Sequence, residues 1–270
     1  MTAPRNLMSS ISICLVAVTL ACGEKKMAPS PRANESMLSD AQIQSLTTKT
    51  IFFGHRSVGE NIVEGIGELM VSEPGLRLVA SSDPAAESDS AFIHAELGEN
   101  GDPQSKNQAF LNALRGFGQR HGIALFKYCY ADVDSSTDVG QLFAGYRKTI
   151  AAAKAAHPAL TLVHVTVPLT TSDSSLKAFL KSAMGRPTLR DANQKRNQFN
   201  RLLKQTYAAD PIFDLAEAES THSDGSRESF TQGGETIYSL APEFTTDGGH
   251  LNQKGRVAVA RKLLLLVSNL

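Results

Sequence analysis

Short strand-like runs alternate with helix-like segments over most of this chain of 270 residues. The runs are apolar and rich in β-branched or aromatic side chains, whereas apolar residues between them recur at helical spacing. We predict strands at 50–53, 76–80, 123–128, 160–167 and 211–215, and helices at 61–71, 106–116, 139–156, 191–208 and 255–267. The alternation predicts parallel βαβ units, and hence an α/β fold in which helices cover both faces of a parallel sheet of about five strands.

The N-terminal residues have the pattern of an export signal. Arg5 precedes an apolar run at 11–21, which is shorter than the roughly 20 residues that a membrane-spanning helix needs. A charged start, an apolar middle and a small-residue end predict a signal peptide over 1–21. Its end, Ala21-Cys22-Gly23, resembles a bacterial lipobox. That resemblance implies an exported protein of the cell envelope, anchored to the membrane by a lipid at Cys22; ordinary cleavage near Ala21 is the alternative.

The rest of the chain divides into a tether and one domain. Residues 22–45 are polar, contain proline and lack a sustained apolar period, which predicts a flexible tether. Residues 46–270 are enough to bury the core of one globular domain. With Cys14 removed and Cys22 lipidated, Cys129 is the remaining thiol, and we expect it to act as a small buried hydrophobe.

Composition and motifs exclude several partners. Lys and Arg number 27, as do Asp and Glu, so no net charge attracts nucleic acid. Neither a P-loop nor a glycine-rich dinucleotide motif is present. The histidines have no metal-ligand spacing with cysteines or carboxylates. We therefore expect no nucleic-acid partner, no cofactor and no metal.

Polar residues stand where sites form in parallel sheets, after the carboxyl ends of strands. The first strand is followed by Gly54-His-Arg-Ser57-Val-Gly59, and the last helix is preceded by Asp247-Gly-Gly-His250. A serine hydroxyl becomes a nucleophile when an imidazole removes its proton, and a carboxylate orients that imidazole. The pattern predicts that Ser57, His250 and Asp247 form a catalytic set. The alternative for Ser57 is a helix N-cap.

The order of these residues resembles that of the SGNH (GDSL-like) hydrolase superfamily. The two motifs that carry the resemblance are Ser57 after the first strand and Asp247-Gly-Gly-His250-Leu-Asn-Gln-Lys-Gly255 before the last helix. In topology the resemblance covers residues 48–270. It implies a flavodoxin-like, three-layer α/β/α sandwich and an esterase, lipase or carbohydrate-deacetylase activity.

The chain departs from that family's pattern where the oxyanion hole is expected. Gly-Asp-Ser is replaced by Gly54-His-Arg-Ser57, and the third strand runs into Lys127-Tyr-Cys-Tyr-Ala-Asp132 in place of Gly-x-Asn-Asp. Candidates for oxyanion or substrate contacts are Gly59, Gly98, Asn100, Gly101, His55, Lys127, Tyr130 and Asp132. A glycine-rich turn is an equal alternative for 98–101, and a buried ion pair for Lys127 and Asp132. For His55 a plain surface position is favoured.

Two functions remain open. One is a hydrolase that acts outside the cytoplasm on a small acyl ester or an acetylated glycan. The other is a non-catalytic envelope lipoprotein that uses the fold for ligand binding or scaffolding. Ser57 and the Asp-x-x-His motif favour the first, and the missing Gly-x-Asn-Asp block favours the second. The polar stretch 220–243 is expected to form a lid or specificity loop.

Replacing Cys22 with Ala is expected to release the protein from membranes, because each buried methylene of an attached lipid adds membrane affinity. Cell fractionation of the wild type and of the Cys22→Ala variant measures this directly. A mature wild-type N-terminus that mass spectrometry finds without lipid would contradict the assignment.

Overall fold

The computed structural model describes residues 1, 37–83, 91–117, 121–172, 184 and 186–270. The chain divides into two units, Met1–Arg32 and Ala33–Leu270, and all elements named below belong to the second unit. The predicted signal peptide and Cys22 lie outside the described residues. Within the described ranges, no helix combines the length and apolar character that crossing a bilayer requires.

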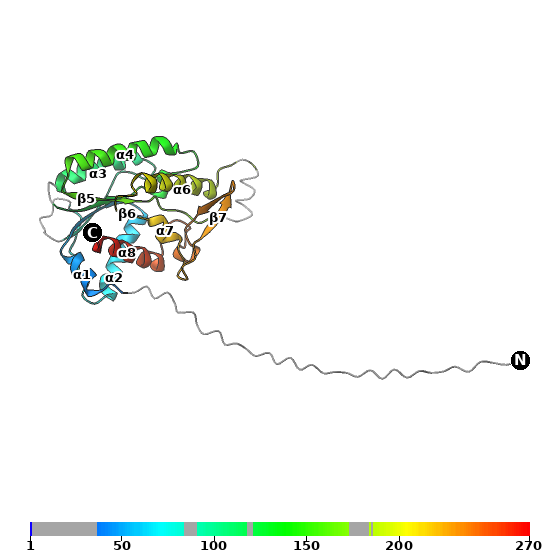
Figure 1. Ribbon diagram of the computed structural model, residues 1–270, viewed down its shortest axis with the longest axis horizontal. Helices are drawn as coiled ribbons and strands as arrows, with labels where there is room; N and C mark the ends of the chain where they lie inside the picture. The colour runs from blue at the N-terminus through cyan, green and yellow to red at the C-terminus, as the bar shows by residue number, and fades with distance from the viewer. Residues whose placement is uncertain (2–36, 84–90, 118–120, 173–183, 185) are drawn as a thin grey trace. The chain divides into compact units, whose positions relative to one another are not determined.

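A six-stranded parallel sheet forms the centre of the second unit (Figure 1). Across the sheet the strands run β2 (Ala80–Ser81), β3 (Ala91–Glu96), β1 (Thr50–His55), β4 (Gly122–Phe126), β5 (Leu160–Val165) and β6 (Ile212–Phe213). Each neighbouring pair is parallel. The predicted parallel α/β architecture is therefore confirmed, with one more strand than expected.

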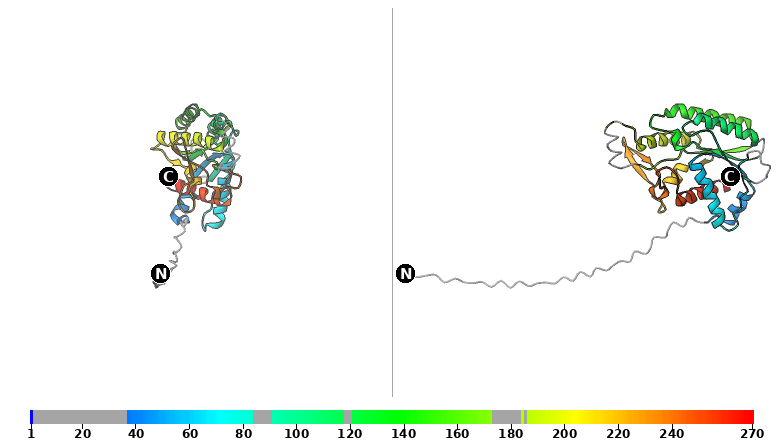
Figure 2. Two further views of the ribbon diagram at one scale, coloured as in Figure 1. Left: turned by 90° about the vertical axis from the view of Figure 1, so that its right-hand side faces the viewer. Right: turned by 180° about the vertical axis from the view of Figure 1, so that it is seen from behind.

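Helices cover both faces of this sheet, as Figures 1 and 2 show. One layer holds α3 (Pro103–Phe117), α4 (Val139–Ala156) and α6 (Leu189–Thr206), and the other holds α1 (Asp40–Thr47), α2 (Val58–Ser72), α7 (Leu215–Ser220) and α8 (Gln253–Ser268). The central strand, β1, contributes side chains to a hydrophobic core on each face of the sheet, because successive side chains point to opposite faces. Ile51 and Phe53 pack with α2 and α8, whereas Phe52 packs with α3, α4 and α6.

The second predicted strand was misplaced. The segment 76–79 is not a strand, and β2 includes only Ala80 and Ser81. The apolar pattern there arises because Leu76 is fully buried in the core beside α2. The true neighbour of β1 is β3, which was missed because its first three residues are all buried and its last three are partly exposed, so that no alternation is visible.

The folded body also begins earlier than predicted. Helix α1 starts at Asp40, inside the expected tether, with Ser39 as its N-cap in a capping box with Gln42. Leu38 is buried, and its N–H donates to the Glu73 carboxylate. These contacts place residues 38–45 in the domain.

The stretch 220–243, expected to be a lid or specificity loop, contains regular structure. A two-stranded antiparallel hairpin, β7 (Ser229–Gln232) and β8 (Glu235–Tyr238), turns at Gly233 and Gly234. Both glycines have positive φ, 59° and 80°, as a type I′ hairpin turn requires. A short 3₁₀ helix, Pro242–Phe244, then leads toward the Asp247 loop.

The contact between α2 and α8 depends on Gly65. A Cβ atom there would lie 2.3 Å from the Arg256 carbonyl oxygen. We expect Gly65→Ala to separate the helices and to lower the free energy of unfolding by about 1–3 kcal/mol.

Gly67 is the matched control, because it lies on the same helix and a Cβ there would have no neighbour within 4 Å. Gly67→Ala is expected to raise the free energy of unfolding by about 0.5–1 kcal/mol, through the helix propensity of alanine. Urea denaturation of both variants compares them, and equal effects would show that the helix contact does not depend on Gly65.

Candidate active site

The structure brings Ser57, His250 and Asp247 together. Ser57 Oγ lies 2.8 Å from His250 Nε2, and His250 Nδ1 lies 2.7 Å from Asp247 Oδ2. The other oxygen of Asp247 accepts from the backbone N–H groups of Gly249, at 2.9 Å, and of His250, at 2.8 Å. These hydrogen bonds, that of Gly249 foremost, hold the pKa of Asp247 well below its usual range. The carboxylate is therefore ionised and aimed at the imidazole.

Two glycines allow the Asp247–His250 turn to close. Gly248 has φ +86°, and a Cβ there would lie 2.9 Å from Thr171 Oγ1. The carbonyl of Gly248 accepts from the Thr171 N–H at 2.9 Å, so the turn is tied to the segment after β5. A Cβ at Gly249 would lie 3.0 Å from the Tyr130 ring. Larger residues at either position would push the turn away from its neighbours.

Ser57 occupies a strained junction between β1 and α2. Its φ of 55° and ψ of −115° make it the one non-glycine residue with positive φ in the part of the chain that is described. Such a backbone costs on the order of 1–3 kcal/mol and persists only where surrounding contacts impose it. Ser57 makes no side-chain cap bond to α2, because its hydroxyl faces His250. Ser57 thus stands at the N-cap position of α2, as the alternative held, but its side chain does not cap the helix.

The topology of the sheet explains why a site forms at this junction. The connection from β1 leads to β2 on one side of it, whereas the connection from its neighbour β4 leads to β5 on the other side, so the two leave in opposite directions along the sheet. Ligands bind at such switch points because the chain leaves an open crevice at the carboxyl ends of the strands. Ser57 follows β1 directly at that place.

The glycines proposed as oxyanion donors are engaged elsewhere. The N–H of Gly59 donates to the Arg56 carbonyl at 3.1 Å, and a Cβ there would lie 2.3 Å from that of His55. The N–H of Gly101 donates to Asp132 Oδ1 at 2.7 Å. Gly98 has φ +56°, in a turn too tight for a side chain. These contacts make Gly59 a packing residue and favour the turn interpretation of 98–101.

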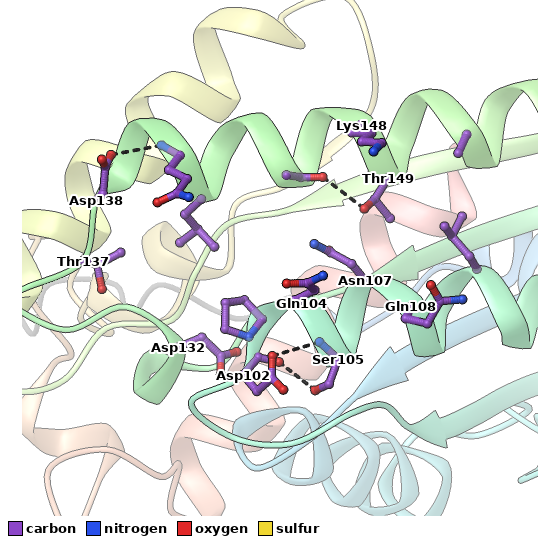
Figure 3. Close-up of a pocket in the computed structure, with 16 residues that line it drawn as sticks. Asp102, Gln104, Ser105, Asn107, Gln108, Asp132, Thr137, Asp138, Lys148 and Thr149 are labelled. Atoms are coloured by element: carbon purple, nitrogen blue, oxygen red, sulfur yellow. Dashed lines mark hydrogen bonds between the residues drawn. The ribbon is translucent and has the colours of Figure 1, made fainter.

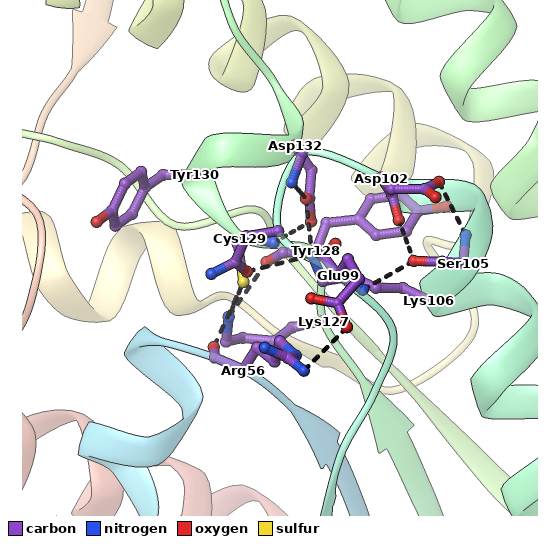
Figure 4. Close-up of polar contacts among 12 residues, drawn as sticks. Arg56, Glu99, Asp102, Ser105, Lys106, Lys127, Tyr128, Cys129, Tyr130 and Asp132 are labelled. Carbon is purple, nitrogen blue, oxygen red and sulfur yellow. Dashed lines mark hydrogen bonds and ion pairs between the residues drawn. The ribbon is translucent and has the colours of Figure 1, made fainter.

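Asp132 forms a buried ion pair with Lys106, shown in Figure 4, and the exposed Asn100 contacts the same lysine. Lys106 Nζ lies 2.7 Å from Asp132 Oδ1 and 3.4 Å from Asn100 Oδ1. The second oxygen of Asp132 accepts from the Cys129 N–H at 2.6 Å. The ion pair of Asp132 is thus formed with Lys106, and not with Lys127 as one alternative held.

Lys127 and Cys129 form a second buried contact that reaches the residue before Ser57. Lys127 Nζ lies 3.3 Å from Cys129 Sγ and 3.4 Å from the Tyr128 carbonyl, and burial lowers its pKa. Cys129 Sγ lies 3.4 Å from the Arg56 carbonyl. Cys129 is buried, as predicted.

Tyr130 faces the Ser57–His250 contact. Its hydroxyl lies 3.4 Å from His250 Nε2, and the two rings meet edge to face. Burial raises the pKa of Tyr130, while a hydrogen bond with Ser57 opposes the rise, so the hydroxyl remains protonated near neutral pH and is able to donate. Arg196, buried beneath it, donates to the Tyr130 carbonyl from Nε at 3.1 Å and from Nη2 at 2.8 Å.

His55 is buried rather than at the surface, which corrects the favoured interpretation. The residue is 1% exposed, and its ring lies beside that of His94 on β3. His94 has no metal-ligand spacing in the sequence, and its strand β3 was not predicted. No sequence spacing links the two, since adjacent strands bring them together.

A cavity of about 910 Å³ lies between α3 and α4, as Figure 3 shows. Amide and charged side chains line it, among them Gln104, Asn107, Gln108 and Lys148. Of the predicted site residues, Asp132 alone is among its lining residues. The cavity is therefore distinct from the Ser57–His250 contact.

No family model matches the chain, and no curated protein matches it in sequence. Among solved structures, it is similar to a carbohydrate acetylesterase from Sinorhizobium meliloti (12% identity, 82% of this chain and 99% of that one, TM-score 0.46). It is also similar to a lipolytic G-D-S-L family member from Veillonella parvula (15%, 80% and 95%, TM-score 0.45). A third is the OSK domain of Drosophila Oskar (10%, 86% and 95%, TM-score 0.43).

Identities of this size concern the fold alone, and we draw no conclusion about activity from scores below 0.5. What supports an activity is the geometry of the chain's own residues.

Glu219, fully buried near Lys127 and Arg196, makes stability depend on pH. Burial raises the pKa of Glu219 to about 8, against an ordinary value of 4.5. Between these values the unfolded chain has released a proton that the folded chain keeps, so the free energy of unfolding falls as pH rises.

We expect Glu219→Gln to remove this dependence, since a glutamine side chain does not titrate. From about pH 4.5 to 8, the wild type should lose on the order of 1–4 kcal/mol relative to the variant. Denaturation curves at several pH values measure the difference, and parallel pH profiles of the two proteins would contradict the expectation.

Proposed function

We propose that this protein is an extracytoplasmic serine esterase of the SGNH type that hydrolyses small acyl esters, such as the acetyl groups of a glycan. The observation that supports this most is the continuous chain of hydrogen bonds from Ser57 through His250 to Asp247, at 2.8 and 2.7 Å. The strained backbone of Ser57 adds support, because strain of this kind collects at catalytic residues. The export signal and Cys22 support a location in the envelope.

In the proposed reaction, Ser57 Oγ attacks the ester carbonyl while its proton passes to His250 Nε2. His250 then gives that proton to the leaving alcohol, and an acyl group remains on Ser57. Water, deprotonated by the same nitrogen, attacks the acyl group and restores the serine. Asp247 stays ionised throughout and stabilises the imidazolium.

The oxyanion requires donors, and we assign two. One is the backbone N–H of Ser57 at the start of α2, where the helix dipole favours negative charge. The other is the Tyr130 hydroxyl, which occupies the place after β4 where the family has an asparagine. Arg196 positions Tyr130 by holding its carbonyl with two hydrogen bonds. In this arrangement Gly59, Gly98 and Gly101 are structural.

Ser57→Ala and His250→Ala are each expected to lower turnover of short-chain esters and acetylated sugars on the order of 10³-fold or more, because triad members act as a unit. Asp247→Asn should lower turnover by the same factor or a smaller one, since Asp247 orients and stabilises His250. A fluorophosphonate probe should label the wild type at Ser57.

Ser72→Ala serves as the control, because Ser72 lies at the other end of α2 and its hydroxyl bonds only to carbonyls of that helix. Its activity and labelling should match the wild type. Folded wild-type protein that neither reacts with the probe nor hydrolyses any ester would instead support the non-catalytic ligand-binding function.

Tyr130→Phe tests the oxyanion assignment separately. The variant keeps the ring that packs against His250 and Gly249 but loses the donor. Loss of one oxyanion donor is expected to lower kcat by about 10²–10³-fold, with little change in KM. Probe labelling at Ser57 should slow as well, and an unchanged kcat would remove Tyr130 from the proposed mechanism.

A further inference from the structure

Three potential metal ligands that the proposed reaction does not use meet beside the β1–α2 junction. They are His55 at the end of β1, Glu60 in the first turn of α2 and His94 on β3. Each offers one ligand atom, and these atoms all lie within 4.8 Å of one another. His55 Nε2 lies 3.1 Å from His94 Nδ1, and His55 Nδ1 lies 3.6 Å from Glu60 Oε2.

The His55 ring is unusually placed for a side chain without a ligand. Its side chain is 0% exposed, and its Nδ1 has no hydrogen-bond partner among the described residues. The 3.6 Å separation from Glu60 is too long for a hydrogen bond. Buried polar atoms without partners are rare because they lose their bonds to water and gain nothing. If Nε2, which points at His94 Nδ1, binds a ligand, the ring proton of His55 belongs on Nδ1, where it faces the Glu60 carboxylate.

From this geometry we infer that His55, His94 and Glu60 bind a divalent transition-metal ion, with zinc as the best fit. Zinc takes imidazole nitrogens at about 2.0–2.1 Å, which places two of them roughly 3.3 Å apart in a tetrahedral site. The 3.1 Å between the two rings already matches this spacing. Two histidines and a carboxylate are a common zinc set, with water as the fourth ligand. Glu60, whose side chain is 47% exposed, leaves room for that water.

The charges around the cluster also affect how strongly a cation would bind there. Lys127 lies near this cluster, since its Cε and the His55 Cβ both approach the place of a Gly59 Cβ, and its charge opposes a cation. The Glu60 carboxylate offsets that charge, so its loss should weaken binding beyond the loss of one ligand bond.

The bound ion would join three elements at the place where the strained backbone is held. His55 precedes Ser57 by two residues and Glu60 follows it by three, while His94 belongs to the neighbouring strand. Zinc would then brace the junction without taking part in the reaction. This departs from the expectation of no metal, which came from spacing along the sequence.

The test uses the purified full-length chain, stripped of metal with a chelator and titrated with ZnCl₂ against a chromophoric zinc indicator. We expect about one zinc per chain with a micromolar or tighter Kd, and a rise in Tm of several degrees at saturating zinc. His94→Ala and Glu60→Gln should each weaken binding at least 10-fold.

Two variants serve as controls. His121→Ala, at an exposed position outside the cluster, should bind zinc as the wild type does. Ser57→Ala should also retain binding, which separates this inference from the esterase proposal. Because Glu60 is half-exposed, Glu60→Gln remains informative if His94→Ala fails to fold. No zinc binding by the wild type, or wild-type affinity in both cluster variants, would overturn the inference.

Discussion

The burial of β1 on both faces is the constraint on which the rest of the structure depends. Phe52 and Phe53, fully buried, belong to the two separate cores, so the strand cannot shift register without exposing one of them. Its position between β3 and β4 makes its carboxyl end the switch point of the sheet. β1 places Ser57 at this switch point, and the proposed role of Ser57 as a nucleophile depends on that position.

Close backbone approaches hold the junction after this strand. At Gly54 a Cβ would lie 2.1 Å from Leu97 Cδ1, and at Gly59 it would meet His55 and Lys127. Packing of this density imposes the positive φ of Ser57. The surrounding contacts outweigh the free-energy cost of this backbone conformation. The result is a hydroxyl turned away from the helix N-terminus and toward His250.

The polar groups beneath the site have a positioning role. Arg196 and the pair of Lys106 and Asp132 hold the loop after β4 through its carbonyl and N–H groups. That loop carries Tyr130, whose hydroxyl faces Nε2 of His250, whereas the Asp247 carboxylate contacts Nδ1 on the other side of the ring. The loop after β4 is in this way held so that it presents the Tyr130 hydroxyl to His250.

The sequence by itself determined the alternation of strands and helices, the positions of the long helices and the grouping of Ser57, Asp247 and His250, because hydrophobic period and the chain order of these three residues are local or ordinal signals. The Gly233-Gly234 pair is also a local signal, since two adjacent glycines are typical of a two-residue hairpin turn. Only the tertiary structure decided the rest. His94 meets His55 across neighbouring strands, and Gly59 and Gly101 lose their N–H groups to other partners. Such pairings depend on which strands lie side by side, and no spacing along one chain encodes that.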